Sequence, residues 1–210
     1  MDAKTKDGSP AAVGILPAAG ESRRMGRPKL LLPYRGTTVV GAVVAALRQA
    51  GAAPIVLVTA PDDADLRRWA AEAGVLAAVN PEPARGMLSS IQEGLAALGG
   101  AAELAEHGRT VLVTPADLPA LRGETVAELL RRMAGDGAVL AVPVHLGRRG
   151  HPLAIAPALL AEIDRLDPAV GLRELLDRHR DAVLEVEVDD AGTVVDVDLP
   201  DDYAGLQPGS

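Results

Sequence analysis

The sequence predicts an α/β protein of three layers, in which helices cover both faces of a mainly parallel β-sheet. Apolar runs of strand length alternate along the chain with helical stretches of about ten residues, which is the pattern of repeated strand–helix–strand units. The apolar runs also lack a period of two, as expected for strands that are covered on both faces. In such a fold, ligands bind beyond the carboxyl ends of the strands.

The expected strands are continuous apolar runs that end at turn residues. The first begins at Val13, and a short extended piece at 30–36 follows it. The remaining strands are expected at residues 54–59, 75–79, 109–113, 138–144, 151–155, 182–188 and 193–197.

The expected helices begin at capping side chains and end at glycine or at a turn. Thr37 should cap a helix that runs to residue 50, and Asp62 or Asp63 should cap one that runs to residue 73. The remaining helices are expected at residues 87–98, 124–133, 157–166, 170–178 and 199–206.

Length and composition predict one soluble domain. With 210 residues and 48% hydrophobic content, the chain can bury a full core, and its lack of Phe leaves Ala, Val and Leu to fill it. We expect a disordered leader at 1–11, a single domain at 12–206 and a loose tail at 207–210. The acidic residues of the leader argue against a secretory signal.

Charge and cysteine content exclude several classes of function. A net charge of −8 argues against nucleic acid or a membrane surface as a partner. No apolar run reaches the roughly 18 residues of a membrane helix. The absence of cysteine excludes disulfides, thiolate metal sites and cysteine nucleophiles, and it fits a cytoplasmic location.

The loop after the first strand concentrates positive charge in this acidic chain. Two glycines, Gly20 and Gly26, should allow positive φ angles and a close approach of the backbone to a ligand. Four cations fall within seven residues of this loop: Arg23, Arg24, Arg27 and Lys29. Amide groups and cations that face one polyanion make a phosphate cradle, so we expect a phosphate-containing ligand here.

Lys29 is the most specific residue of this loop. Only three of the 21 basic residues are lysines, and the other two lie in the leader. Retaining lysine in a chain that otherwise uses arginine suggests a need for a compact ammonium group; the structural alternative is a surface cation that packs its aliphatic stem. The loop matches neither the Walker A pattern nor the G-x-G-x-x-G dinucleotide pattern.

The loop resembles the signature of the MobA-like nucleotidyltransferases, which is roughly Leu-Ala-Ala/Gly-Gly-x-Ser-x-Arg-Met-Gly-x-x-Lys. Pro17 stands where Leu is usual. The matching residues are Ala18, Ala19, Gly20, Ser22, Arg24, Met25, Gly26 and Lys29. The resemblance implies a GT-A-like, Rossmann-like fold. It also implies that residues 17–20, 22–26 and 29 bind the nucleotide, with Arg23 among them, and that Lys29 and Arg24 have catalytic roles.

Asp117 follows the apolar run at 109–113 and lies between Pro115 and Pro119, which stiffen the backbone. A carboxylate at this position can hold a hard divalent cation that bridges phosphate oxygens. The alternative role, as a helix cap, is disfavoured because the next helix begins after Gly123. The family has an Asp-x-Pro segment here, which implies that Asp117 is a catalytic metal ligand and that Pro115 contacts the nucleotide.

A second acidic segment, residues 195–203, is similar to a C-terminal Asp-x-Asp-Thr-Pro-x-Asp motif of nucleotidyltransferases, with Leu199 in place of Thr. The resemblance implies that Asp198 supplies a second metal carboxylate. The alternative is that Asp198 caps the last helix, with Pro200 at its first position.

Three further segments resemble the molybdopterin cytidylyltransferase branch of the family. The Gly-Met-x-Ser-Ser segment at 86–90 opens a helix, where amides and hydroxyls can contact a base or ribose; capping alone is the alternative. Gly86, Ser90 and the preceding Asn80 are therefore expected to bind the nucleotide. His151, in a Gly-His-Pro segment, and Arg173, in an Asp-x-x-x-Gly-x-Arg segment, are expected on the acceptor side, although His151 could equally be structural.

Together these resemblances imply Mg²⁺-dependent transfer of CMP from CTP to a molybdenum–molybdopterin acceptor, with release of pyrophosphate. A recipient molybdoenzyme or its maturation factors would be partners. Two alternatives stay open. One is transfer of GMP or another nucleotide to molybdopterin, a phospho-acid or a sugar phosphate. The other is a non-catalytic maturation factor that binds a nucleotide or cofactor and delivers it to a molybdoenzyme.

Overall fold

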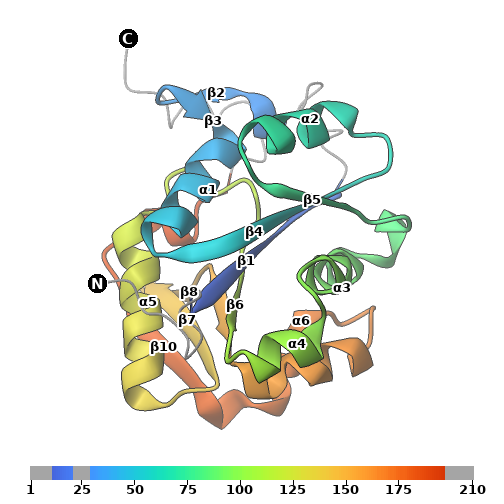
Figure 1. Ribbon diagram of the computed structural model, residues 1–210. Coiled ribbons are helices and arrows are strands. Elements are labelled where there is room, and N and C mark those ends of the chain that lie inside the picture. The colour runs from blue at the N-terminus through green and yellow to red at the C-terminus, as the bar shows by residue number, and fades with distance from the viewer. Residues whose placement is uncertain (1–10, 21–28, 197–210) are drawn as a thin grey trace.

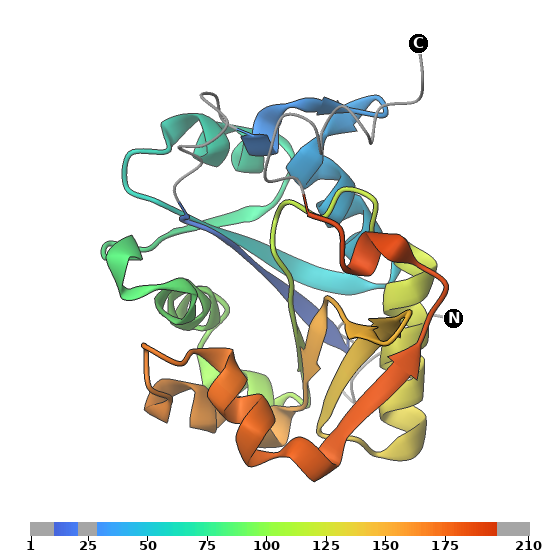
Figure 2. The same ribbon diagram turned by 180° about the vertical axis from the view of Figure 1, so that it is seen from behind.

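The computed structural model describes residues 11–20 and 29–196 and contains one large β-sheet with helices on both faces (Figures 1 and 2). The strand order is β10-β7-β9-β6-β1-β4-β5, and β8 pairs with β7. The strands are β1 (Ala12–Ala18), β4 (Ala52–Thr59), β5 (Leu76–Val79), β6 (Thr110–Val113), β7 (Leu140–His145), β8 (Arg148–Arg149), β9 (Leu153–Ile155) and β10 (Val183–Glu187). A separate small hairpin pairs β2 (Pro33–Tyr34) with β3 (Thr37–Thr38).

The sheet is mixed but mostly parallel, as expected. Strand β1 is central and runs parallel to both β4 and β6, so that Ile15 lies opposite Val56 on one side and Val113 on the other. Strand β9 runs antiparallel to its neighbours β6 and β7. Because β1, β4 and β6 are parallel, their carboxyl ends meet at one edge of the sheet, and the loops that follow them can form one site.

The two helical layers enclose two separate hydrophobic cores. One face packs against α1 (Val39–Gln49), α2 (Ala64–Glu72) and α5 (Gly123–Asp136). The other face packs against α3 (Met87–Ala97), α4 (Ala101–Glu106), α6 (Leu172–Arg178) and the long 3-10 helix η4 (Pro157–Arg165). The shorter 3-10 helices are η2 (Lys29–Leu31), η3 (Pro83–Arg85), η5 (Arg180–Ala182) and η6 (Ala191–Thr193). This arrangement confirms the three-layer prediction.

Strand β1 explains why the apolar runs lack alternation. Val13 and Ile15 are buried in the core beneath α3, whereas Leu16 is buried in the core beneath α1. Both faces of the strand therefore select apolar residues. Gly94 of α3 lies so close to β1 that a Cβ there would come within 2.6 Å of Ile15, so this glycine lets the helix pack tightly on the strand.

Several expected boundaries differ in the structure. Thr38, not Thr37, caps α1, and its side-chain oxygen accepts a hydrogen bond from the Gly41 amide at 3.1 Å. The cap of α2 is Asp63. Helix α4 was not expected, and residues 157–165 form a 3-10 helix rather than an α-helix.

The strand expected at 193–197 is wrong over the part that the structure describes. Residues 191–193 instead form η6, because the Asp190 carboxylate accepts a hydrogen bond from the Gly192 amide at 3.0 Å and turns the chain. Most of the expected leader, residues 1–10, lies outside the described residues. The expected helix at 199–206 and the tail also lie outside them. Within the described ranges, no helix combines the length and apolarity needed to cross a membrane.

Candidate active site

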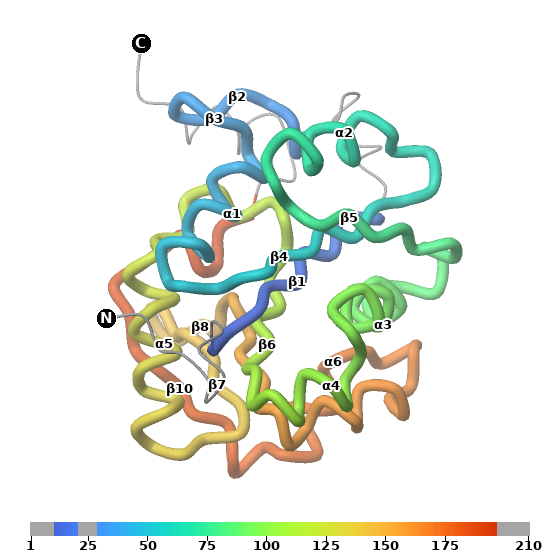
Figure 3. Tube along the Cα trace, viewed as in Figure 1, coloured from blue at the N-terminus to red at the C-terminus, as the bar shows by residue number. Residues whose placement is uncertain are grey.

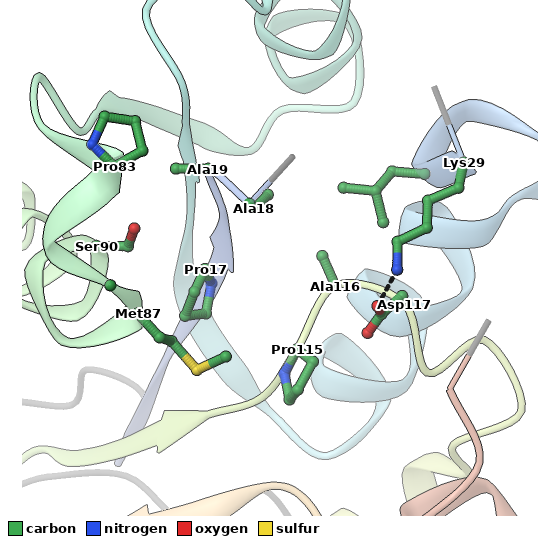
Figure 4. Close-up of a pocket in the computed structure, with 13 residues that line it drawn as sticks. Pro17, Ala18, Ala19, Lys29, Pro83, Met87, Ser90, Pro115, Ala116 and Asp117 are labelled. Atoms are coloured by element: carbon green, nitrogen blue, oxygen red, sulfur yellow. Dashed lines mark hydrogen bonds and ion pairs between the residues drawn. The ribbon is translucent and has the colours of Figure 1, made fainter. Parts of the chain in front are cut away.

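A cavity of about 330 Å³ lies at the carboxyl ends of β1 and β6 and beside the start of α3 (Figure 4). Its walls come from three segments that lie far apart in the sequence, within residues 17–30, 83–90 and 115–117. The lining residues are Pro17, Ala18, Ala19, Gly20, Lys29, Leu30, Pro83, Gly86, Met87, Ser90, Pro115, Ala116 and Asp117. Pro83, Met87 and Ser90 lie on one side of the cavity, and Lys29 and Asp117 lie on the other. The structure thus brings Gly20 and Lys29, the two ends of the loop at 20–29 (the cation loop), together with the Gly-Met-x-Ser-Ser and Asp-x-Pro segments.

Lys29 and Asp117 form an ion pair at the edge of this cavity. The ammonium of Lys29, at the start of η2, donates to Oδ2 of Asp117 at 2.6 Å, and the side chains are 14% and 17% exposed. Asp117 lies in the loop that follows β6. The pair joins residues 88 positions apart, and its partial burial protects it from screening by solvent.

The second carboxylate oxygen of Asp117, Oδ1, is buried and has no hydrogen-bond partner among the described residues. A buried carboxylate oxygen without a partner is costly, so it calls for a ligand. A hard divalent cation fits this donor, since Mg²⁺ is held by one or two carboxylates together with substrate phosphates. Among the described residues, no cluster of three or more His, Cys, Asp or Glu side chains could hold a metal ion by itself.

The start of α3 forms the opposite wall. Gly86 precedes the helix with φ 89° and ψ −179°, a conformation that is essentially restricted to glycine. Gly86 and Met87, at the N-terminus of α3, line the cavity, where the helix dipole has its positive end. Ser90 lies in the second turn of α3 and lines the cavity. This wall can therefore bind the polar edge of a ligand.

Asn80 does not line the cavity and instead holds α3 in place. It is 1% exposed, its amide donates to Ser89 Oγ at 2.8 Å and to Ser90 Oγ at 3.0 Å, and its Oδ1 accepts from the Glu82 amide. Asn80 was expected in the nucleotide-binding set, and its contacts make it a support for Ser90. The sequence analysis missed four lining residues, Leu30, Pro83, Met87 and Ala116, although Met87 and Ala116 lie inside segments that it singled out.

The cation loop is described at its two ends only. Ser22, Arg23, Arg24, Met25 and Gly26 lie outside the described residues. The expectation of a positive φ is wrong for Gly20, which is not among the glycines with left-handed backbone. Gly20 lines the cavity, and no atom of the described residues lies within 4 Å of the position that a Cβ there would take.

The two residues expected on the acceptor side do not line the cavity. Burial lowers the pKa of the His151 imidazole, whereas the Val113 backbone and the charges of Asp117 and Asp196 act in the opposite direction. His151 Nδ1 is buried without a hydrogen-bond partner in the described structure. Arg173 lies on α6, and its side chain is 84% exposed. Its Nε lies 3.9 Å from Oδ2 of Asp177. Asp198 lies outside the described residues.

Known proteins resemble this chain over most of its length. The molybdenum cofactor cytidylyltransferase of Escherichia coli (strain K12) is 30% identical over 193 residues, 90% of this chain and 92% of the relative. A probable molybdenum cofactor guanylyltransferase of Mycobacterium bovis (strain BCG / Pasteur 1173P2) is 34% identical over 164 residues, 77% of this chain and 74% of the relative. Nicotine blue oxidoreductase of Paenarthrobacter nicotinovorans is 32% identical over 199 residues, 90% and 93% respectively.

Solved structures and a family model agree with these likenesses. The crystal structure of Rv0371c from Mycobacterium tuberculosis H37Rv in complex with manganese has a TM-score of 0.72 and 28% identity, covering 93% of this chain and 97% of that one. Nucleotidyltransferases of lower identity share the fold and confirm the GT-A-like architecture. The family model of the MobA-like NTP transferase domain matches residues 14–183. The chain therefore belongs to the MobA-like NTP transferase family of nucleotidyltransferases.

Proposed function

We propose that this protein transfers CMP from CTP to a molybdenum–molybdopterin acceptor and releases pyrophosphate. The observation that carries the proposal is the Lys29–Asp117 pair, because an ammonium and a carboxylate with one unpartnered oxygen face the same cavity. This combination suits a triphosphate with its divalent cation: the ammonium neutralises phosphate charge, and the carboxylate holds the cation.

The residues of the chain act by positioning and by neutralising charge. A phosphate of the acceptor attacks the α-phosphate of CTP, the new phosphoanhydride bond forms, and pyrophosphate leaves with the electrons of the broken bond. No nucleophile from the protein is needed. Lys29 stabilises the developing negative charge, and the amides at the start of α3 orient the nucleotide. Bound Mg²⁺, held by Asp117 and by Asp198, would supply Lewis-acid stabilisation of the phosphate oxygens. Arg24 would add a second cation.

CTP is the proposed nucleotide because Ala19 lines the cavity and is 4% exposed. Its methyl group narrows the space beside the backbone, which suits a pyrimidine and crowds a purine. The likeness to a cytidylyltransferase supports this choice. A second candidate is transfer of GMP, which the likeness to a probable guanylyltransferase favours. A panel of nucleoside triphosphates with the same acceptor separates the two.

Pyrophosphate release tests the reaction class. We expect release that requires CTP, the acceptor and Mg²⁺ together, without any added redox cofactor. A protein that binds CTP but releases no pyrophosphate with any nucleotide would instead be a delivery factor. A protein that turns over only with a reduced nicotinamide or flavin would follow the relative named as an oxidoreductase.

We place the reaction in the cytoplasm, with a recipient molybdoenzyme or its maturation factors as the next partner, and with no role for nucleic acid or membrane.

A further inference from the structure

The side-chain amide of Asn80 is held in one orientation by the backbone. Asn80 follows β5, where the chain passes from the sheet toward the start of α3 (Figure 3). Its Oδ1 lies 2.9 Å from the Glu82 amide nitrogen, which can only donate a hydrogen bond. The oxygen therefore faces Glu82, and the NH₂ group faces the other way. Nδ2 lies 2.8 Å from Ser89 Oγ and 3.0 Å from Ser90 Oγ, so each of its hydrogens goes to one serine.

The two serines differ in where their own protons go. Each hydroxyl accepts a hydrogen bond from Asn80 and has one proton left to donate. Ser89 Oγ lies 2.7 Å from the carbonyl oxygen of Gly86, which can only accept, so Ser89 donates its proton there. Ser90 Oγ donates to no carbonyl or carboxylate among the described residues. The proton of Ser90 is therefore available to a ligand.

Ser90 carries this free proton at the cavity. It lines the cavity from α3, on the wall that also holds Pro83 and Met87 (Figure 4). The residue is only 3% exposed. A hydroxyl donor that is this deeply buried costs free energy when it has no acceptor. A ligand that places a hydrogen-bond acceptor beside Ser90 is therefore favoured over one that places a donor there.

A donor that is fixed in the wall of a site distinguishes nucleotide bases by their edges. The pairing edge of cytosine carries two adjacent acceptors, N3 and O2, whereas guanine carries donors, N1–H and N2–H₂, at the two atoms that pair with these. A hydroxyl held as a donor can bond to either acceptor of cytosine. The same hydroxyl finds only donors at the corresponding atoms of guanine.

We propose that Asn80 is a positioning residue that holds the Ser90 hydroxyl as a donor toward the base, so that the site selects a base edge carrying acceptors, as cytosine does. This inference rests on the proposed transfer from CTP, and it adds a source of base preference that is separate from the methyl group of Ala19. Asn80 does not touch the nucleotide, because its oxygen and both amide hydrogens are already used. A purely structural role would weaken the binding of every nucleotide alike.

The test is isothermal titration calorimetry of the full chain with CTP or GTP and Mg²⁺, without acceptor, so that the measurement does not depend on turnover. Asn80→Asp keeps the size of the side chain and the bond from the Glu82 amide, but its second oxygen can only accept. Both serine hydroxyls then donate to it, and Ser90 turns its lone pairs toward the cavity. We expect the affinity for CTP relative to that for GTP to fall by about tenfold. The added negative charge acts on both triphosphates alike and leaves their ratio unchanged.

A double-mutant cycle shows whether the two residues act as one unit. Ser90→Ala removes the donor itself and should lower the ratio of CTP to GTP affinity by a similar factor. Adding Asn80→Asp to Ser90→Ala should lower that ratio no further. Glu82→Gln is the matched control, because Glu82 bonds to Asn80 only through its backbone amide and its side chain is 65% exposed. This control should bind both nucleotides as the wild type does.

Three results would overturn the inference. The first is a wild-type ratio of CTP to GTP affinity in Asn80→Asp or, if that variant does not fold, in Ser90→Ala. The second is a double variant in which the two losses add. The third is a wild-type protein that binds GTP as tightly as CTP. Selective binding of CTP that is lost in both single variants, without any turnover in the presence of acceptor, would support the inference and refute the proposed function.

Discussion

Asp117 and Asp190 are both acids that follow a strand of the same sheet, yet their surroundings differ. The fold satisfies both oxygens of Asp190 with hydrogen bonds from α5 and from its own turn. It satisfies one oxygen of Asp117 with Lys29 and leaves the other buried without a partner in the described structure. The comparison teaches that burial alone does not identify a functional acid. A carboxylate whose bonding capacity is left incomplete points to a ligand, whereas a complete one points to architecture.

The largest effect should come from Asp117→Asn. The amide keeps the size of the side chain but loses the charge that holds a hard cation, and it also removes the partner of Lys29. We expect kcat/KM to fall by about 10²–10³-fold, more than for Asp190→Asn, with the melting temperature preserved. Activity against Mg²⁺ concentration is the measurement. Asp198→Asn should weaken activity or raise the Mg²⁺ concentration that activity requires. If Asp117→Asn and Asp198→Asn both show the wild-type dependence of activity on Mg²⁺, the metal site lies elsewhere.

Lys29 tests the other half of the Asp117 site. Lys29→Ala should remove most of the turnover, by roughly 10²-fold, because a positive charge on the phosphates is lost. Lys29→Arg should also fail to restore activity, since a planar guanidinium does not replace a compact ammonium at a partly buried pair. Steady-state kinetics with the same acceptor measure both variants, and circular dichroism checks the fold. An arginine variant with full activity would refute the role assigned to Lys29.

Ala19→Gly should change the choice of nucleotide rather than the chemistry. Removing one methyl group from the cavity wall should relax the preference for CTP over GTP by roughly 10-fold or more, the scale of a small apolar size difference. Full inversion is not expected, because Ser90 and the start of α3 also face the ligand. The ratio of kcat/KM for CTP to kcat/KM for GTP, measured for the wild type and for Ala19→Gly, decides the matter. A wild-type protein that uses both nucleotides equally would end the cytidylyl assignment.

His151 lies within reach of the charges of Asp117 and Asp196, and substituting it should give the smallest effect. Burial lowers its pKa below the ordinary 6.5, so the folded protein resists protonation that the unfolded chain accepts. Stability from this residue is therefore present above pH 6.5 and is lost as the pH falls through that value toward the lower folded pKa. His151→Gln should reduce the acid-induced fall in melting temperature by about 2–4 °C. An unchanged pH dependence would contradict the burial of a neutral imidazole.

Local sequence patterns predicted much of the fold and the Asp117 site. The strands at 54–59 and 109–113, the helix at 87–98 and the position of Asp117 after a buried strand all follow from apolar runs and turn residues near in sequence. These signals are strong because both faces of the central strands are buried. The family resemblance grouped Lys29, Gly86 and Asp117 as nucleotide-binding residues, and all three line the cavity.

Contacts between distant segments could not be predicted in this way. The run Val-Val-Asp-Val at 194–197 has the composition of a strand, but the Asp190 carboxylate captures the Gly192 amide and turns the chain beforehand. The role of Asp190 depends on Thr125 and Arg122, which lie 65 and 68 residues away. Similarly, nothing near Asn80 in sequence indicates that its amide serves two serines of the next helix. Such roles depend on packing, which only the folded chain defines.

The most direct test of the proposed activity is mass spectrometry of the products formed from CTP or GTP with molybdenum–molybdopterin and Mg²⁺. We predict a cytosine dinucleotide of the cofactor and one equivalent of pyrophosphate, formed with CTP in preference to GTP and lost in Asp117→Asn. A guanine dinucleotide as the main product would contradict the choice of nucleotide. No dinucleotide with either triphosphate, from a folded protein that has bound the acceptor, would contradict the proposed transfer itself.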